Sequence, residues 1–245
     1  MTGRPAQASA VVTGASRGIG AAIARALARD GWPVAINYRS DEAGAVKVAQ
    51  QIGADGGSAF TVQGDVADPA TAAALLESAA ERLGPVLCLV NNAGIRADNL
   101  ALSLEEAEWT EVLETNLTAA FRLTKLALRG MIRARYGRVI NVASIVGPRA
   151  NAGQSNYAAA KAGLIAMSNT IAVEVARRGV TVNTLAPGLI ETEMTAGIGT
   201  ALLDSVPAKR AGKPEDVAAC AAFLASDAAG YVNASTLYVD GGLAA

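Results

Sequence analysis

Tyr157 and Lys161 lie four positions apart in the segment NYAAAKAGLIAM, whose composition predicts a helix. That spacing places both side chains on one face of the helix, one turn apart. A tyrosine hydroxyl has an ordinary pKa near 10, so at neutral pH it is a poor acid and a poor base. An ammonium about 5 Å away favours the phenolate by roughly 3 kcal/mol at an effective dielectric near 20, or about two pKa units, before desolvation acts in the opposite direction. The pair therefore predicts a tyrosine with a lowered pKa that transfers a proton to or from a substrate oxygen.

Ser144 and Asn116 are the polar residues expected close to this pair. Ser144 comes directly after the apolar segment VINVA, so its hydroxyl is expected at a strand end, where it can hold a substrate carbonyl. Asn116 lies within the helical segment ETNLTAAF, although asparagine is unfavourable inside a helix. Its amide is either part of an active-site relay or a structural hydrogen-bonding group, and the sequence leaves both interpretations open. The alternative for the pair itself is an amphipathic helix with a surface lysine and a half-buried tyrosine.

The segment TGASRGIG, residues 13–20, separates the apolar run AVVT from a helical run that begins near Gly18. Glycines allow positive φ and a close approach of a pyrophosphate to backbone N–H groups, and the N-terminus of the next helix adds partial positive charge. The spacing is GxxxGxG, which differs from the GxGxxG pattern of many dinucleotide-binding proteins. A plain glycine turn is the alternative. The loop predicts a dinucleotide phosphate site with contacts at Gly14, Ser16, Arg17, Gly18, Ile19 and Gly20.

The same loop contains the pattern GxSxG, at 14–18, which is also typical of the nucleophilic serine of α/β-hydrolases. That serine needs an imidazole to accept its proton. The chain contains no histidine, so such a hydrolase is excluded and Ser16 is expected to be a turn residue or a phosphate ligand. Without histidine, Cys88 and Cys220 cannot assemble a structural zinc site, and no metal is expected. Both cysteines lie in apolar segments and are expected to be buried small residues.

Arg39 follows the second predicted strand, which ends in NYRS at 37–40. In the usual dinucleotide fingerprint an acidic residue at this place holds the adenosine ribose hydroxyls. An arginine stands here instead, and together with Arg17 it can bind a 2′-phosphate through planar, permanently charged groups. The sequence therefore favours NADPH over NADH, with a solvated surface charge as the alternative for Arg39. Asp41 and Glu42 are expected to form the N-cap and first turn of the next helix.

The composition restricts the partners and the compartment. The chain has 245 residues, of which 51% are hydrophobic, and its formal net charge of −1 is too balanced to attract nucleic acid or an anionic membrane. No apolar run reaches the roughly 18 residues that a membrane-spanning helix needs, and residues 1–9 lack the apolar core of a secretory signal. We expect a cytoplasmic protein with no nucleic-acid and no membrane partner.

Short β-branched segments alternate with longer alanine-rich segments along the chain. Because the strand-like segments are apolar without alternation, we expect an α/β fold in which they form a parallel, doubly wound sheet with helices on both faces. Such sheets bind ligands at the C-terminal ends of their strands, where the glycine loop falls. A single domain is expected over 1–245, with a flexible tail at 1–8 and a substrate lid at 188–212. The predicted strands are 10–13, 34–37, 59–62, 86–90, 138–143, 180–186 and 236–239. One predicted helix begins near residue 18, and two others cover about 108–135 and about 154–178.

Several motifs together resemble the short-chain dehydrogenase/reductase family, and most closely its 3-oxoacyl-(acyl-carrier-protein) reductases. The resemblance extends from about residue 10 to residue 242. It implies a single-domain Rossmann-type sheet of seven strands, an NADP-dependent oxidoreductase and a homotetramer. The motifs that carry it are TGASRGIG at 13–20, GDV at 64–66, NNAG at 91–94, Asn116, Ser144, the pair of Tyr157 and Lys161, and PGLIETEMT at 187–195.

The resemblance also implies roles for individual residues. Tyr157 would protonate a carbonyl oxygen as hydride arrives from the nicotinamide, Ser144 would orient the carbonyl, and Lys161 would hold the nicotinamide ribose. Asn116 would anchor a water in a proton relay. Besides the glycine loop and Arg39, the implied cofactor contacts are Asp65 and Val66 near the adenine, Asn92, Ala93 and Gly94 along the dinucleotide, Tyr157 and Lys161, and Pro187, Gly188, Ile190 and Thr192 on the nicotinamide side.

The implied reaction is NADPH-dependent reduction of a 3-oxoacyl thioester on acyl carrier protein, in fatty-acid or polyketide synthesis. Val173 stands where these reductases can carry a basic docking residue, so docking would depend on Arg129, Arg133 and Arg135, which also suit a helix C-terminus. Two alternatives stay open. One is a dehydrogenase of a small alcohol, sugar or steroid, and the other is a dinucleotide-binding sensor or scaffold without catalysis.

Overall fold

The computed structural model describes residues 3–192 and 200–245, and its centre is one parallel β-sheet. Within these residues the sheet has seven strands in the order β3-β2-β1-β4-β5-β6-β7. The predicted strands are confirmed to within one residue at every end. The strands are β1 (Ser9–Val12), β2 (Val34–Tyr38), β3 (Ala59–Gln63), β4 (Val86–Asn91), β5 (Gly137–Val142), β6 (Val180–Pro187) and β7 (Thr236–Val239).

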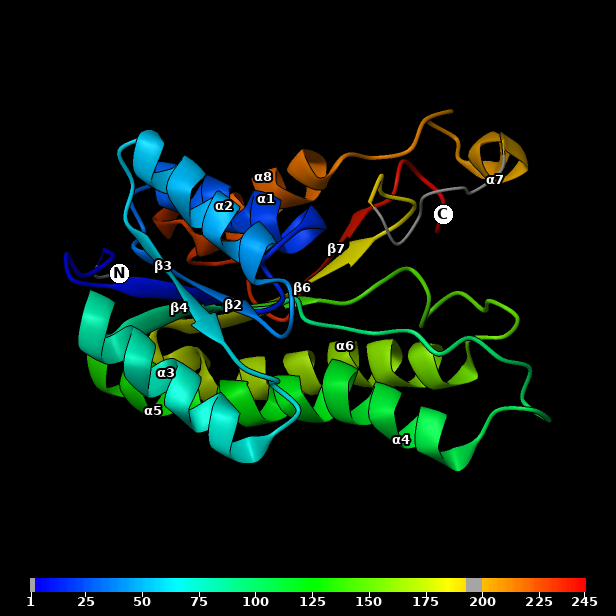
Figure 1. The fold of residues 1–245 in the computed structure, drawn as a ribbon, viewed down its shortest axis with the longest axis horizontal. Coiled ribbons are helices and arrows are strands. Elements are labelled where there is room, and N and C mark those ends of the chain that lie inside the picture. Colours follow the sequence, from blue (N-terminus) through cyan, green and yellow to red (C-terminus); the bar gives the residue numbers. More distant parts are fainter. Residues whose placement is uncertain (1–2, 193–199) are drawn as a thin grey trace.

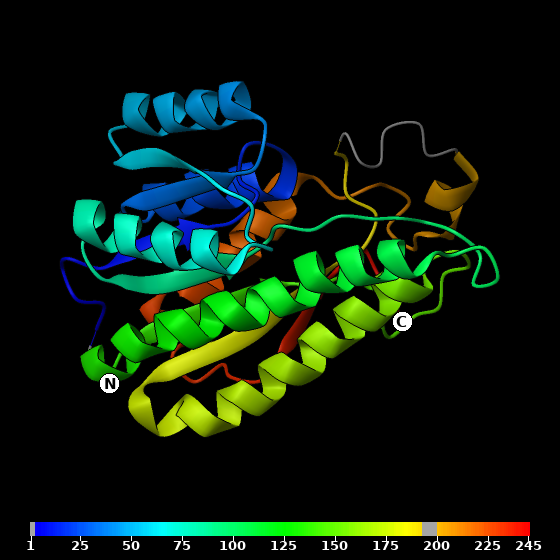
Figure 2. The same cartoon turned by 60° about the horizontal axis from the view of Figure 1, so that its bottom comes forward.

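Helices cover both faces of the sheet (Figure 1). On one side lie α1 (Gly18–Arg29), α2 (Glu42–Ala54) and α8 (Pro214–Ala225). On the other side lie α3 (Pro69–Leu83), α4 (Glu106–Leu113), α5 (Ala119–Ala134) and α6 (Ser155–Val175), as Figure 2 shows after rotation. The short α7 (Thr200–Ser205) lies beside the C-terminal edge of the sheet. The predicted doubly wound α/β class is confirmed.

The central strands are mostly apolar because both of their faces are covered. Every residue of β1, β2, β4, β5 and β6 is buried, whereas the edge strands β3 and β7 are partly exposed. The polar residues within these strands, such as Asn141 of β5 and Asn183 of β6, are buried as well, so neither face of the strands is open to water. The main core therefore lies against both faces of the five central strands.

The strand order reverses between β1 and β4, where the chain returns from the β3 edge to the centre. Connections that leave in opposite directions open a crevice at the C-terminal ends of the strands. Thr13 joins the two strand ends, because its Oγ1 accepts hydrogen bonds from the N–H groups of Asn92 at 2.9 Å and Ala93 at 3.0 Å. Asn92 Nδ2 donates in return to the carbonyls of Thr13 at 2.9 Å and Gly14 at 3.0 Å. The glycine loop and the NNAG segment are thereby held side by side.

The helix predicted over about 108–135 is interrupted. α4 ends at Leu113, a π-helical turn η1 (Glu114–Thr118) follows, and α5 starts at Ala119. A π-helical turn inserts an extra residue into the hydrogen-bond ladder and is frequent at functional sites. The helix predicted over about 154–178 consists of α6 and the 3₁₀ turn η2 (Ala176–Arg178).

The segments predicted to be a tail and a lid are described in part. Arg4 lies over the Trp32 ring, 4.6 Å from its centroid, and donates a hydrogen bond to the Asp30 carbonyl at 3.0 Å. Within the predicted lid, residues 193–199 lie outside the described residues. The lid's two described ends are joined by a β-bridge between Ile190 and Gly212. No helix of the described ranges is long and apolar enough to cross a bilayer.

Candidate active site

A cleft of about 800 Å³ runs along the C-terminal ends of the central strands. Toward β2 it is lined by the glycine loop and Arg39, and toward β5 and β6 it is lined by Ser144, Tyr157 and Lys161. Every residue predicted for catalysis or cofactor binding lines this cleft, with the exception of Asn116. Asn116 is 1% exposed and lies behind the residues that line the cleft. The structure thus brings together residues that the sequence places at separate strand ends.

The glycine loop leaves its backbone open to a ligand. Gly14 has a φ of 59°, and a Cβ there would lie 3.0 Å from the Cα of Ala93. α1 begins at Gly18, and its N-cap residue Arg17 makes no side-chain capping bond. The first-turn residues line the cleft, so their uncapped N–H groups and the helix dipole suit an anion. This cradle fits the diphosphate of a dinucleotide.

Arg39 and Arg17 stand at the β2 end of the cleft. The Arg39 guanidinium lies 3.7 Å from the Asp65 carboxylate, and the Arg17 guanidinium lies 3.8 Å from that of Asp41. The two arginine side chains are 57% and 64% exposed, so these ion pairs are weak and can exchange for a phosphate group. Asp41 Oδ1 accepts a hydrogen bond from the Gly44 N–H at 3.0 Å, which confirms its predicted capping of α2.

Tyr157 is partly buried near the start of α6, and Ser144 lies near enough to lower the pKa of its hydroxyl. Burial raises the pKa of Tyr157 above its ordinary value, and this effect exceeds the lowering by Ser144 and by the Arg96 charge. The prediction that Lys161 leaves Tyr157 with a lowered pKa is therefore wrong. The physical reason is desolvation, which penalises the phenolate and which a Coulomb estimate between two point charges leaves out.

Lys161 is only 3% exposed, so the alternative of a surface lysine is wrong. Its Nζ donates a hydrogen bond to the carbonyl of Val142, the last residue of β5, at 2.8 Å. The same atom lies 5.6 Å from the centre of the Tyr157 ring. Burial lowers the pKa of Lys161 to about 8. The two side chains are therefore neighbours, as their spacing predicts, and the amine lies beside the ring.

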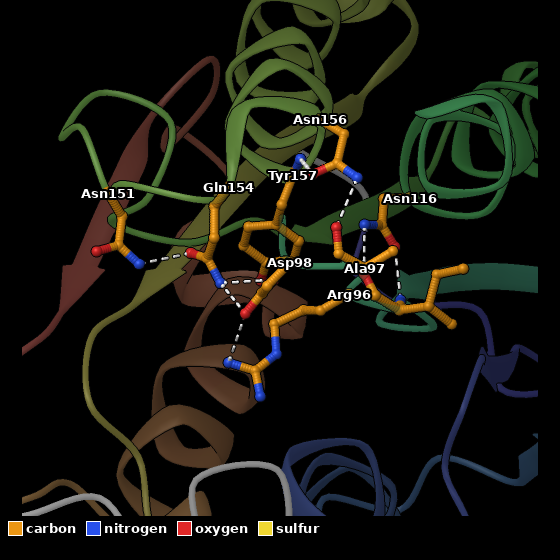
Figure 3. A network of polar contacts seen from close by, with 9 residues as sticks. Arg96, Ala97, Asp98, Asn116, Asn151, Gln154, Asn156 and Tyr157 are labelled. Atoms are coloured by element: carbon orange, nitrogen blue, oxygen red, sulfur yellow. Dashed lines mark hydrogen bonds and ion pairs between the residues drawn. The ribbon is translucent and has the colours of Figure 1, made fainter. Parts of the chain in front are cut away.

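Asn116 lies in the π-helical turn η1 and binds the loop that follows β4. Its Oδ1 accepts a hydrogen bond from the Ile95 N–H at 2.8 Å, and its Nδ2 donates to the Ile95 carbonyl at 2.9 Å (Figure 3). A Cβ on Gly94 would lie 2.9 Å from Asn116 Oδ1, so the amide also packs against the cleft wall. The structural hydrogen bonds are present, and the relay role of Asn116 stays a prediction.

Comparison with known proteins places this arrangement in a family. A family model described as enoyl-(acyl carrier protein) reductase matches residues 14–244. The 3-oxoacyl-(acyl-carrier-protein) reductase of Vibrio cholerae is 50% identical over 238 residues, which cover 96% of each chain. The chain belongs to the short-chain dehydrogenase/reductase family.

Two further members of this family show the range of similarity. The 3-oxoacyl-(acyl-carrier-protein) reductase of Escherichia coli strain K12 is 47% identical over 238 residues, again 96% of each chain. A solved structure assigned as a gluconate dehydrogenase of Agrobacterium tumefaciens is 34% identical and superposes with a TM-score of 0.92 over 97% of this chain and 96% of that chain. The cofactor of the short-chain dehydrogenase/reductase family is a nicotinamide dinucleotide, and the glycine cradle fits it.

This short-chain dehydrogenase/reductase also carries a polar network that the sequence analysis did not identify (Figure 3). Asn156 Nδ2 donates to the Ala97 carbonyl at 2.9 Å, and Gln154 Nε2 donates to both carboxylate oxygens of Asp98 at 3.0 and 2.9 Å. The Arg96 guanidinium lies 4.0 Å from the same carboxylate. A signal was present in the sequence, because the charged segment IRAD directly follows the NNAG motif at the strand end.

Proposed function

We propose that this protein is an NADPH-dependent reductase that converts a 3-oxoacyl thioester, carried by acyl carrier protein, into the 3-hydroxyacyl form. The observation that carries the proposal is the one cleft that is lined both by the glycine cradle and by Ser144, Tyr157 and Lys161. The names of bacterial relatives that are 43–50% identical to this chain support the substrate class. Fatty-acid or polyketide synthesis would use this reaction.

The proposed reaction gives each polar residue a separate task. Ser144 Oγ accepts a hydrogen bond from the Val146 N–H at 3.0 Å, so its own hydrogen is available to orient the oxygen being reduced. Tyr157 is protonated at neutral pH, as an ordinary tyrosine is, and it donates its hydroxyl proton to that oxygen. Lys161 places a positive charge beside the ring and favours the phenolate left behind. A bound nicotinamide cofactor supplies the hydride, and Asn116 holds the loop that borders the reacting groups, with the anchoring of a relay water as the alternative role.

The cofactor would lie along the cleft from Arg39 to Lys161. A 2′-phosphate would replace carboxylates as the partner of Arg39 and Arg17, and this exchange supports a preference for NADPH. Lys161 would hold the nicotinamide ribose. The proposed contacts are Gly14, Ser16, Arg17, Gly18, Ile19, Gly20, Arg39, Asp65, Val66, Asn92, Ala93, Gly94, Tyr157, Lys161, Pro187, Gly188, Ile190 and Thr192.

The test is reduction of an acetoacetyl thioester by the purified protein, followed as NADPH consumption. Tyr157→Phe removes the proton donor without removing the ring, and we expect its turnover to fall by about 10²–10⁴-fold. Tyr231→Phe is the matched control, because that side chain is 94% exposed and does not line the cleft. Full turnover by Tyr157→Phe would contradict the proposal and revive a role as a sensor or scaffold.

The same assay tests two alternative activities. The matching family model is named for enoyl reduction, so a 2-enoyl thioester is offered in parallel. The Agrobacterium tumefaciens structure favours a sugar or small-alcohol dehydrogenase, so gluconate oxidation with NAD or NADP is measured as well. We expect the 3-oxoacyl thioester to give the highest kcat/KM, and a higher value for either rival substrate would reassign the enzyme.

The proposed assembly is a cytoplasmic homotetramer that receives acyl carrier protein. Exposed apolar side chains are available for contacts between subunits, among them Trp109 of α4, Phe121 of α5 and Phe223 of α8. Arg129 and Arg133 are exposed on α5 and carry the positive charge that an acidic carrier protein would contact. Light scattering of the purified protein tests the tetramer, and a monomer at working concentration would contradict it.

A further inference from the structure

The loop that follows β4 is held rigidly where it borders the cleft. Amides from η1 and α6 bind the backbone of Ile95 and Ala97, and the Gln154 amide binds both oxygens of the Asp98 carboxylate (Figure 3). Gln154 is 5% exposed, and its Oε1 accepts a hydrogen bond from Asn151 Nδ2 at 2.8 Å. This second bond fixes the Gln154 amide with its nitrogen toward Asp98. A surface loop with these anchors is a fixed platform rather than a mobile connection.

Arg96 is the cationic residue of this anchored loop, which follows β4. It lines the cleft together with Ser144 and Tyr157, whereas Asp98 lies outside the lining. The Arg96 guanidinium is 4.0 Å from the Asp98 carboxylate, and its side chain is 35% exposed. The Arg96 charge also acts at the reacting hydroxyl, because it lowers the pKa of Tyr157. The guanidinium therefore lies near an anchored carboxylate and lines the same cleft as the proton donor.

We propose that Arg96 is a specificity-determining residue that donates a hydrogen bond to a second carbonyl oxygen of the substrate, two carbons from the carbonyl that is reduced. In the proposed function, on which this inference rests, that second oxygen belongs to the thioester. Asp98 and Gln154 are positioning residues, because they act on the substrate only through Arg96.

The chemistry of a 3-oxoacyl thioester requires such a donor. When Ser144 and Tyr157 bind the C3 oxygen, the C1 oxygen enters the cleft as well, and burying it without a donor costs about 1–3 kcal/mol. Arginine offers five N–H donors in a planar fork and stays charged at every working pH. A ketone without a second oxygen gains nothing from this donor, so Arg96 discriminates between the two classes of substrate.

The experiment compares an acetoacetyl thioester with a cyclic monoketone in wild type and Arg96→Gln, with NADPH binding measured separately by fluorescence. We expect Arg96→Gln to lower kcat/KM for the thioester by at least about tenfold and to change it for the monoketone by less than about twofold. NADPH affinity should stay unchanged. Arg96→Lys should recover part of the thioester activity, and Asp98→Asn should lower it in the same direction by a smaller factor.

Arg149→Gln is the matched control, because Arg149 lines the same cleft but donates to the Leu243 carbonyl at 2.6 Å. Its ratio of thioester to monoketone activity should equal that of wild type. Equal losses for both substrates in Arg96→Gln, or no loss, would overturn the role of Arg96 while the wild-type thioester activity still supports the proposed function. A wild-type enzyme that reduces the monoketone but not the thioester would overturn the proposed function and this inference together.

Discussion

Lys161 extends its ammonium beside the aromatic ring of Tyr157, with Nζ 5.6 Å from the ring centre. Both groups are largely buried, and burial shifts their two pKa values in opposite directions. Burial raises the pKa of the Tyr157 phenol above its ordinary value of 10.0, and it lowers the pKa of the Lys161 ammonium to about 8. As pH rises, Lys161 therefore loses its charge before Tyr157 loses its proton.

This order predicts the alkaline limb of the pH profile. The kcat/KM for carbonyl reduction should fall as pH rises through about 8, because deprotonated Lys161 no longer favours the phenolate left by proton transfer. The measurement is kcat/KM against pH with saturating NADPH. In Lys161→Met the residual activity should show no decline near that pH, and a surviving limb would assign it to a different group.

Arg39 predicts a selective loss of NADPH affinity. Arg39→Asp removes the cation at the β2 end of the cleft and adds a second carboxylate next to Asp65, so NADPH should bind about 10- to 100-fold more weakly. NADH, which lacks the 2′-phosphate, should lose far less. Titration calorimetry measures both, and Arg29→Asp controls for net charge, because Arg29 pairs with Asp55 on the surface away from the cleft. Equal losses for the two cofactors would refute the assignment.

Asn116→Ala separates the two interpretations of the asparagine in η1. If the amide is structural, the variant leaves the N–H and carbonyl of Ile95 unpaired and lowers the free energy of unfolding by about 2–4 kcal/mol. Urea denaturation measures this change. We expect the loss of stability together with weaker cofactor binding, because the loop after β4 lines the cleft. A variant with wild-type stability and cofactor affinity but reduced kcat would instead favour the relay.

The fold was predictable because its signals are local and uniform. Five central strands are buried on both faces, so their sequences are mostly apolar, as in the segment VLCLV of β4. The candidate site was predictable for a related reason, because parallel strands bring all their C-terminal ends to one edge of the sheet. The spacing of Tyr157 and Lys161, and the place of Ser144 after β5, then required no knowledge of side-chain packing.

What the sequence did not predict depends on burial and on contacts between distant segments. The direction of the Tyr157 pKa is set by desolvation, which a helical spacing does not report. Asn116, in the π-helical turn, binds Ile95, which is 21 positions away in the sequence. Gln154 binds Asp98, which is 56 positions away. No periodic pattern encodes such pairs, so the sequence alone does not place Arg96 in the site.

The proposed docking of acyl carrier protein predicts a substrate-dependent effect of charge on α5. Arg129 and Arg133 are exposed near the C-terminal end of this helix, about 20–25 Å from Asn116 at 1.5 Å of rise per residue. Reversal of both charges to glutamate should raise KM for an acyl-carrier-protein thioester and leave KM for a small thioester unchanged. Steady-state kinetics on the two substrates checks this, and an equal effect on both would show that the arginines do not dock the carrier.

Gly20 and Gly130 are two glycines in helices, and they predict opposite effects of one added methyl group. A Cβ on Gly20 would lie 2.5 Å from Asn92 Nδ2 and 2.5 Å from the Gly14 carbonyl oxygen. Gly20→Ala must therefore displace the Asn92 amide that joins the strand ends, and we expect lower stability and severely weakened NADPH binding. Gly130 lies inside α5 with nothing within 4 Å of an added Cβ.

Gly130→Ala should therefore raise the free energy of unfolding by about 0.5–1 kcal/mol, because alanine has the higher helix propensity, and it should leave NADPH affinity unchanged. Chemical denaturation and fluorescence titration of the two variants measure both quantities. Both substitutions place alanine in a helix, so both variants gain the same helix propensity. The difference between the two variants in stability and in NADPH affinity therefore reports the contact of the added methyl group with Asn92 and Gly14. Unchanged NADPH affinity in Gly20→Ala would show that the cradle tolerates a side chain and is not shaped for a diphosphate.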